Sequence, residues 1–121
     1  MVTKREIQEL IEPFLSREDA NSKVDQCGRL SNMAALELQE NGIQAKRVDG
    51  KVKGNSELDH SFVIVPVSEV SNVSEGPLIV DPTAEQFADE TRTDAQWGSV
   101  EKFNAVEVFE PSNRLYKMYK W

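Results

Sequence analysis

The sequence predicts an α+β protein in which helices pack on a small antiparallel sheet. Residues 3–15 and 25–42 carry apolar side chains at helical spacing. From residue 43 onward the pattern changes to short apolar runs, which are separated by polar stretches and are typical of strands. At 121 residues the chain is long enough for one domain, 1–121, and too short for a second.

The first helix has a clear start and a disturbed end. Thr3 and Glu6 have the spacing of a capping box, in which each side chain bonds the backbone of the other residue. Pro13 lacks a backbone donor and disfavours helical geometry at the residue before it. We therefore expect this helix to end near Ile11 or to kink there.

The second helix contains Cys27, the only cysteine of the chain. Asp25 is the best N-cap candidate and places Cys27 at the second helical position. Asn41 and Gly42 supply the stop signal, because glycine readily adopts the left-handed conformation at a helix end. The partial positive charge of the helix N-terminus would stabilise a Cys27 thiolate.

The sequence next predicts a strand that leads toward the only histidine. Residues 43–52 alternate apolar and polar side chains, with Gly50 as a bend. A polar loop over 51–59 then reaches His60, which we expect at the start of a strand. The apolar run 62–65 indicates that this strand is covered on both faces.

A third strand and a docked C-terminus complete the expected sheet. Residues 78–81 form a short apolar run that closes on Asp81 and is stopped by a proline. A short helix is expected over 84–88. The last twenty or so residues are too apolar for a free tail, so we expect a strand near 105–109 and a strand or helical turn after Pro111.

Composition excludes several classes of function. The net charge of −7 argues against a nucleic-acid partner, which requires clustered basic residues. One cysteine and one histidine do not supply a zinc site, and we expect neither a metal nor a cofactor. The densest basic group is interpreted as a solvated edge; it comprises Lys46, Arg47, Lys51 and Lys53.

Nothing in the sequence indicates a membrane segment or a secretion signal. An apolar run of about 18 residues, the length of a spanning helix, does not occur. The first residues carry charges where a signal peptide needs an apolar core. The expected location is therefore the cytoplasm, or that of an effector delivered without a visible signal peptide.

The order of Cys27, His60 and Asp81 suggests a thiol nucleophile, its base and the group that orients the base. Each residue also has an ordinary structural interpretation. A lone cysteine in a helix is often a small apolar filler, a lone histidine a surface or capping residue, and an aspartate before proline a turn. The joint arrangement at the ends of adjoining elements favours the catalytic interpretation.

Three motifs also carry a resemblance to a known family: Cys27-Gly28-x-Leu30-Ser31, His60-Ser-Phe-Val-Ile-Val and Ile79-Val-Asp81-Pro82-Thr83-x-x-Gln86-Phe87. They resemble the transglutaminase-like and papain-fold cysteine enzymes of bacteria and their phages. The likeness looks closest to small papain-fold toxin or effector domains. It covers residues 22–88.

The resemblance implies a role for each matching residue. Cys27 would be the nucleophile, His60 the general base and acid, and Asp81 the orienter. Papain-like enzymes place an oxyanion-hole glutamine about where this chain has Asn21, whose shorter amide could donate in the same way. Gln26 is a second candidate for the oxyanion hole.

Other residues have supporting roles in this hypothesis. Trp97 either lines the acyl pocket or packs in the core. Gln86 and Phe87 would support the turn that follows Asp81.

The expected function is a cysteine-dependent amide hydrolase or acyltransferase that acts on a protein or peptide substrate. Peptidase and glutamine deamidase are both open, and transglutaminase is the alternative reaction. The alternative of another class is a non-catalytic papain-like binding module. The resemblance to toxins also implies a cognate inhibitor or immunity protein as a partner.

Overall fold

The computed structural model describes residues 1–15, 27–53, 57–82 and 106–121, with only the backbone at 14, 15, 27, 57 and 58. Its elements are, in chain order, α1 (Lys4–Leu15), α2 (Cys27–Glu40), β1 (Lys46–Lys53), β2 (Glu57–Val65), β3 (Leu78–Asp81), β4 (Glu107–Phe109) and β5 (Tyr119–Lys120). Among the described residues, no helix is long and apolar enough to cross a membrane.

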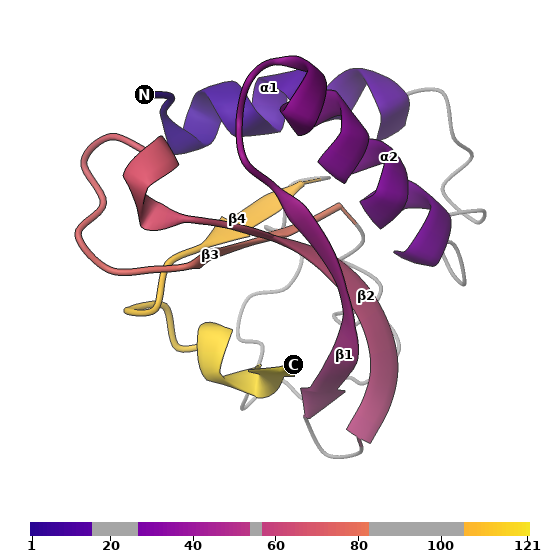
Figure 1. Cartoon of the computed structure of the whole chain (residues 1–121). Coiled ribbons are helices and arrows are strands. Elements are labelled where there is room, and N and C mark those ends of the chain that lie inside the picture. The colour runs from indigo at the N-terminus through magenta and orange to yellow at the C-terminus, as the bar shows by residue number, and fades with distance from the viewer. Residues whose placement is uncertain (16–26, 54–56, 83–105) are drawn as a thin grey trace.

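The strands form one sheet in the order β4-β3-β2-β1-β5, and all neighbours are antiparallel. The sheet is curled into a half-barrel, and both helices lie on the same side of it (Figure 1). The predicted α+β class and the antiparallel sheet are therefore confirmed.

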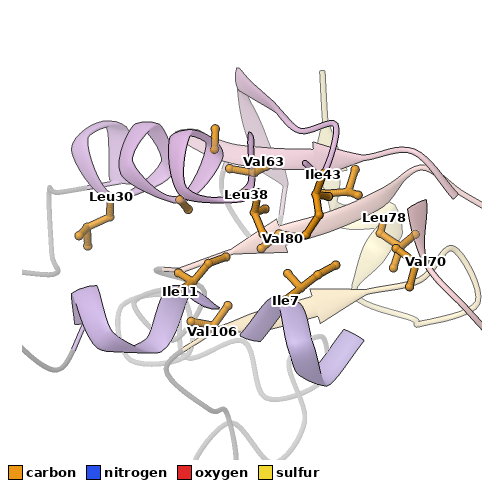
Figure 2. Close-up of a cluster of buried hydrophobic side chains, with 13 residues drawn as sticks. Ile7, Ile11, Leu30, Leu38, Ile43, Val63, Val70, Leu78, Val80 and Val106 are labelled. Atoms are coloured by element: carbon orange, nitrogen blue, oxygen red, sulfur yellow. The ribbon is translucent and has the colours of Figure 1, made fainter. Parts of the chain in front are cut away.

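The sheet separates two apolar clusters. The helix-side cluster joins α1 and α2 to one sheet face (Figure 2). The aromatic-side cluster lies on the other face and includes the C-terminal segment. Because side chains alternate along a strand, Val63 and Val80 belong to the first cluster, whereas Phe62 and Ile79 belong to the second.

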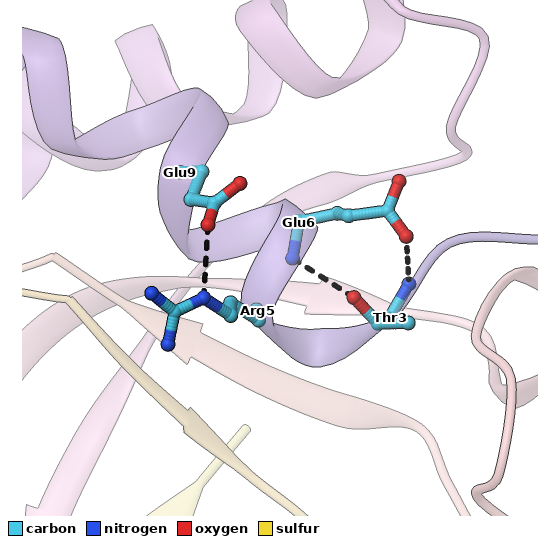
Figure 3. A network of polar contacts seen from close by, with 4 residues as sticks. All are labelled: Thr3, Arg5, Glu6 and Glu9. Carbon is cyan, nitrogen blue, oxygen red and sulfur yellow. Dashed lines mark hydrogen bonds and ion pairs between the residues drawn. The ribbon is translucent and has the colours of Figure 1, made fainter.

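The capping box at the start of α1 is confirmed. The Glu6 amide donates to Thr3 Oγ1 over 3.0 Å, and the Thr3 amide donates to Glu6 Oε1 over 3.2 Å (Figure 3). One turn further, Arg5 Nε donates to Glu9 over 2.9 Å, and this pair is solvent-exposed. Because exposed ion pairs contribute little to stability, the capping box stabilises α1 more than the pair of Arg5 and Glu9 does.

The expected end of α1 near Ile11 is wrong, because the helix runs through Pro13 to Leu15. Ile7 and Ile11 are buried in the helix-side cluster, whereas Pro13 is exposed. Pro13 has no N–H to donate to the carbonyl one turn earlier in the helix. Because this side of the helix is exposed, water can bond that carbonyl instead, and the cost in stability is small.

The predicted end of α2 is confirmed. Gly42 has a φ of +78°, the left-handed conformation that terminates helices, and its amide donates to the Gln39 carbonyl. The Ile43 amide donates to the Leu38 carbonyl over 2.9 Å, and both side chains are buried. This C-cap directs the chain from α2 into β1.

Two expectations for the next segment are wrong. Gly50 does not interrupt the strand, because β1 is continuous from Lys46 to Lys53. The strand tolerates no side chain there, since a Cβ on Gly50 would collide with the Lys120 carbonyl oxygen of β5. The loop expected over 51–59 is also wrong: β2 starts at Glu57, so β1 and β2 are joined as a hairpin and His60 lies within β2.

The remaining strands agree with the sequence. Pro66 ends β2, and β3 covers the predicted 78–81. The C-terminal segment is docked as predicted, with β4 over 107–109 and a 3-10 turn that leads into β5. The helix predicted over 84–88 lies outside the described residues.

We predict that Gly50→Ala destabilises the protein by about 1–3 kcal/mol, because the new methyl group must displace β5. The free energy of unfolding from urea denaturation measures the loss. Lys53→Ala is the matched control, since Lys53 is exposed on the same strand and should change stability by less than about 0.5 kcal/mol. Equal effects of the two substitutions would contradict the close approach of β5.

Candidate active site

The structure brings His60 and Asp81 together. His60 Nε2 lies 2.7 Å from Asp81 Oδ2, and both side chains are fully buried. The pair spans adjacent antiparallel strands, β2 and β3, which are held in register by the pairing of Val63 with Val80. A carboxylate oxygen has no proton to donate, so an ionised Asp81 fixes the tautomer that carries hydrogen on Nε2.

Tyr119 is a third member of this group and was not predicted from the sequence. Its hydroxyl donates to the same oxygen, Asp81 Oδ2, over 2.6 Å. Burial raises the pKa of Tyr119 well above its ordinary value, and the neighbouring Asp81 charge raises it further. The phenol therefore stays protonated and remains a donor to the carboxylate.

The start of α2 is anchored to β2 beside this group. Ser31 Oγ donates to the Ser61 carbonyl over 2.9 Å, and both residues are buried. A Cβ on Gly28 would lie 4.0 Å from Ser61 Oγ and 3.1 Å from Arg47 Nη2. The first turn of α2, with the Cys27 backbone, thus lies against the residue that follows His60.

A polar network lines the strand surface under this turn. Ser61 Oγ donates to Asp49 Oδ1 over 2.6 Å, and Arg47 Nε donates to the same oxygen over 3.0 Å. The Ser61 hydrogen bond, and then that of Arg47, lowers the pKa of Asp49 below its ordinary value. Asp49 consequently stays ionised and holds the Arg47 guanidinium near Gly28.

A cleft of about 490 Å³ opens at this place. We call it the His60 cleft; its lining residues are Arg47, Asp49, Gly50, Lys51, Asp59, His60 and Ser61. It lies beside the first turn of α2, and charged and polar residues predominate in its lining. The His60 side chain itself is fully buried, so the cleft presents the charged and polar side chains beside it rather than the imidazole.

Strand alternation places neighbouring residues on opposite sheet faces. The Ser61 side chain faces α2, because its Oγ would lie 4.0 Å from a Cβ on Gly28. The His60 ring is stacked on Phe62 at 6.0 Å and therefore lies on the face of the aromatic-side cluster. The start of α2 and the His60 ring thus meet the same strand from its two sides.

Several predicted site residues lie outside the described part of the chain. These are Asn21, Gln26, Gln86, Phe87 and Trp97. Cys27 is described by its backbone, as the first residue of α2, and its side chain is not part of the description. Its proposed role as a nucleophile, and those of His60 and Asp81, therefore stay predictions.

Within the described ranges, no group of three or more histidine, cysteine, aspartate or glutamate side chains is arranged to hold a metal ion. Comparison with known protein families, curated proteins and solved structures finds no match for this chain.

We predict that Tyr119→Phe lowers the free energy of unfolding by about 1–3 kcal/mol at neutral pH, because Asp81 loses a buried donor. The raised pKa of Tyr119 also predicts a pH dependence. The stability that comes from keeping the phenol neutral is present below the unfolded pKa of about 10 and is lost as the pH rises toward the folded pKa.

Urea denaturation between neutral and strongly alkaline pH measures both effects. Tyr116, the other tyrosine of the chain, provides the control, because Tyr116→Phe leaves the contact between Tyr119 and Asp81 intact. The Tyr119→Phe variant should lose most of the alkaline destabilisation. The Tyr116→Phe variant should keep the larger part of it, because burial also raises the pKa of Tyr116 but the pKa of Tyr119 is raised further. The reverse pattern would contradict the assigned hydrogen bond.

Proposed function

We propose that this protein is a cysteine-dependent amide hydrolase or acyltransferase with a papain-like or transglutaminase-like fold. The observation that carries the proposal is the buried pair of His60 on β2 and Asp81 on β3, 2.7 Å apart, together with the anchoring of the start of α2 to β2 from the opposite sheet face. The anchoring serine, Ser31, belongs to the motif that carries the resemblance to this class.

Each residue has a defined task in the proposed reaction. His60 takes the proton of the Cys27 thiol, and the thiolate attacks the amide carbonyl carbon to give a tetrahedral oxyanion. Nδ1 is the ring nitrogen for this transfer, because Nε2 is engaged with Asp81. The intermediate collapses to a thioester while His60 returns the proton to the leaving amine.

The second half of the reaction decides the activity. Water attacks the thioester in a peptidase or a glutamine deamidase, which yields a free acid and restores the thiol. A lysine amine attacks in a transglutaminase, which yields a new amide. The substrate is a protein or peptide in each case, and a toxin of this kind would have a cognate immunity protein.

A second candidate of another class is favoured by one observation. The His60 and Asp81 side chains are fully buried on the sheet face opposite to α2. In a non-catalytic binding module these side chains, with Tyr119, would serve only to join strands β2, β3 and β5. The reactivity of the cysteine separates the two candidates.

We predict that iodoacetamide labels Cys27 at about pH 6 at least about tenfold faster in the folded protein than in urea, because a thiol of ordinary pKa is almost wholly protonated there. His60→Gln should reduce the rate to that of the unfolded chain. Ser61→Ala is the control, since it alters the neighbouring residue and leaves the imidazole in place. Slow labelling that does not depend on His60 would contradict the enzyme proposal and favour the binding module.

The reaction itself is identified by mass spectrometry. Candidate proteins are incubated with the wild type and with Cys27→Ser, which nearly conserves volume and should leave the unfolding free energy within about 1 kcal/mol. Only the wild type should convert a glutamine to glutamate, cleave a peptide bond or form a crosslink. A strong loss of stability with retained activity in Cys27→Ser would show that the cysteine is a core filler.

A further inference from the structure

Two hydrogen-bonding groups converge on a single oxygen of Asp81. Its Oδ2 atom lies 2.7 Å from His60 Nε2 and 2.6 Å from the hydroxyl oxygen of Tyr119. A carboxylate oxygen has two lone pairs and can accept both hydrogen bonds at once. The three side chains come from β2, β3 and β5, and all of them are buried. Tyr119 therefore acts on the same atom that orients the imidazole.

The phenol of Tyr119 is itself held in place. Its backbone is the register partner of Val52 in β1, and its ring centroid lies 5.0 Å from that of Phe62 and 5.6 Å from that of Phe109. A hydroxyl on such a packed ring is a pre-organised donor. Burial raises the pKa of Tyr119 and the Asp81 charge raises it further, so the hydroxyl stays protonated at every pH at which a histidine titrates.

A second donor fixes the orientation of the carboxylate. The torsion that turns a carboxyl group about its Cβ–Cγ bond is broad, so a single donor leaves either oxygen able to face the imidazole. The Tyr119 hydroxyl reaches Oδ2 from β5, whereas His60 reaches it from β2. Because both groups bond the same atom, the Asp81 side chain is held in one orientation, which keeps the His60 proton on Nε2.

The same hydrogen bond also tempers the charge beside His60. A donor to a carboxylate takes up part of its negative charge and favours its ionised form. Asp81 then attracts a proton less strongly, whether the proton goes to the carboxylate or to the neighbouring imidazole. Tyr119 thus lowers the proton affinity of the pair and favours the neutral imidazole, which is the form that can act as a base.

Charged side chains also lie on the strands around the pair. They are Arg47, Asp49 and Lys51 of β1, Asp59 of β2, Glu107 of β4, which is the register partner of Asp81, and Lys120 of β5. Tyr119→Phe changes none of these groups. The substitution therefore isolates the effect of the phenol hydroxyl.

We propose that Tyr119 is a positioning residue for the His60 base. Its hydroxyl holds the Asp81 carboxylate in one orientation and takes up part of its charge, so that His60 stays neutral with its proton on Nε2. This role rests on the proposed function, in which His60 accepts the proton of Cys27. Tyr119 itself neither takes nor gives a proton, so Cys27 should remain reactive without the hydroxyl.

The test observes the imidazole directly. His60 is the only histidine of the chain, so NMR spectra of the full chain contain one set of imidazole signals. The ring ¹⁵N shifts show which nitrogen carries the proton, and their change with pH gives the titration midpoint. At neutral pH the Nε2 proton moves downfield as its hydrogen bond to Asp81 strengthens. Tyr119→Phe is compared with Tyr116→Phe, which removes a phenol that bonds a backbone carbonyl instead.

A further protein keeps the phenol and strengthens its hydrogen bond. Tyr116→Phe leaves Tyr119 as the only tyrosine, so biosynthetic incorporation of 3-fluorotyrosine then alters a single ring. The fluorine makes the hydroxyl more acidic, and therefore a better donor, while it nearly preserves the size of the ring. This protein should fold even if Tyr119→Phe does not.

We expect Tyr119→Phe to raise the titration midpoint of His60 by about one pH unit and to move the Nε2 proton downfield. The fluorinated protein should lower the midpoint by at least about 0.3 pH unit relative to Tyr116→Phe and move the Nε2 proton upfield. Tyr116→Phe alone should leave both close to the wild type. A hydroxyl that only stabilises the fold would not produce opposite changes when its hydrogen bond is removed and when it is strengthened.

Three results would overturn the positioning role. The first is an imidazole whose proton lies on Nδ1 in the wild type. The second is an unchanged Nε2 proton in the fluorinated protein, and the third is a change of the same sign in the fluorinated protein and Tyr119→Phe. The proposed function is measured separately, because the labelling of Cys27 can fail while the His60 signals behave as expected, and the reverse.

Discussion

A buried carboxyl group that must be hydrogen bonded constrains the rest of this structure. Asp81 is fully buried, and burying a charged or polar group without partners costs several kcal/mol. Two donors from distant parts of the chain, His60 and Tyr119, meet its Oδ2 atom. Strands β2, β3 and β5 are therefore tied at one point, and the two-residue strand β5 has a reason to stay docked.

Strand β2 transmits this constraint to the helical layer. The His60 side chain bonds Asp81 on one face, and the side chain of the next residue, Ser61, bonds Asp49 on the other, while the Ser61 carbonyl accepts a hydrogen bond from Ser31. A shift of one residue in register would exchange these two faces and break both sets of contacts. The position of the Cys27 turn is thus linked to the position of the imidazole, whatever the chemical role of either.

The sequence alone predicted the features that depend on neighbouring residues, but not those that depend on contacts between residues distant in the chain. The capping box at Thr3, the helix stop at Gly42 and the short strand before Pro82 depend on neighbours, and they were predicted correctly. Gly50 looked like a bend because its sequence context does not reveal the approach of Lys120, seventy residues away in the chain. The pairing of Tyr119 with Asp81 is equally non-local. It arises from strand order, which apolar patterning does not specify.

The same buried group determines which experiments discriminate between the two functional candidates. Replacing His60 removes its hydrogen bond with Asp81. Loss of activity in such a variant is therefore expected both if His60 is the catalytic base and if it only stabilises the fold. Tyr119 separates the two effects: it stabilises the same carboxyl oxygen but has no assigned role in proton transfer. If Tyr119→Phe costs stability and leaves Cys27 reactive, whereas His60→Gln removes the reactivity of a folded protein, the imidazole acts on the thiol beyond its structural contribution.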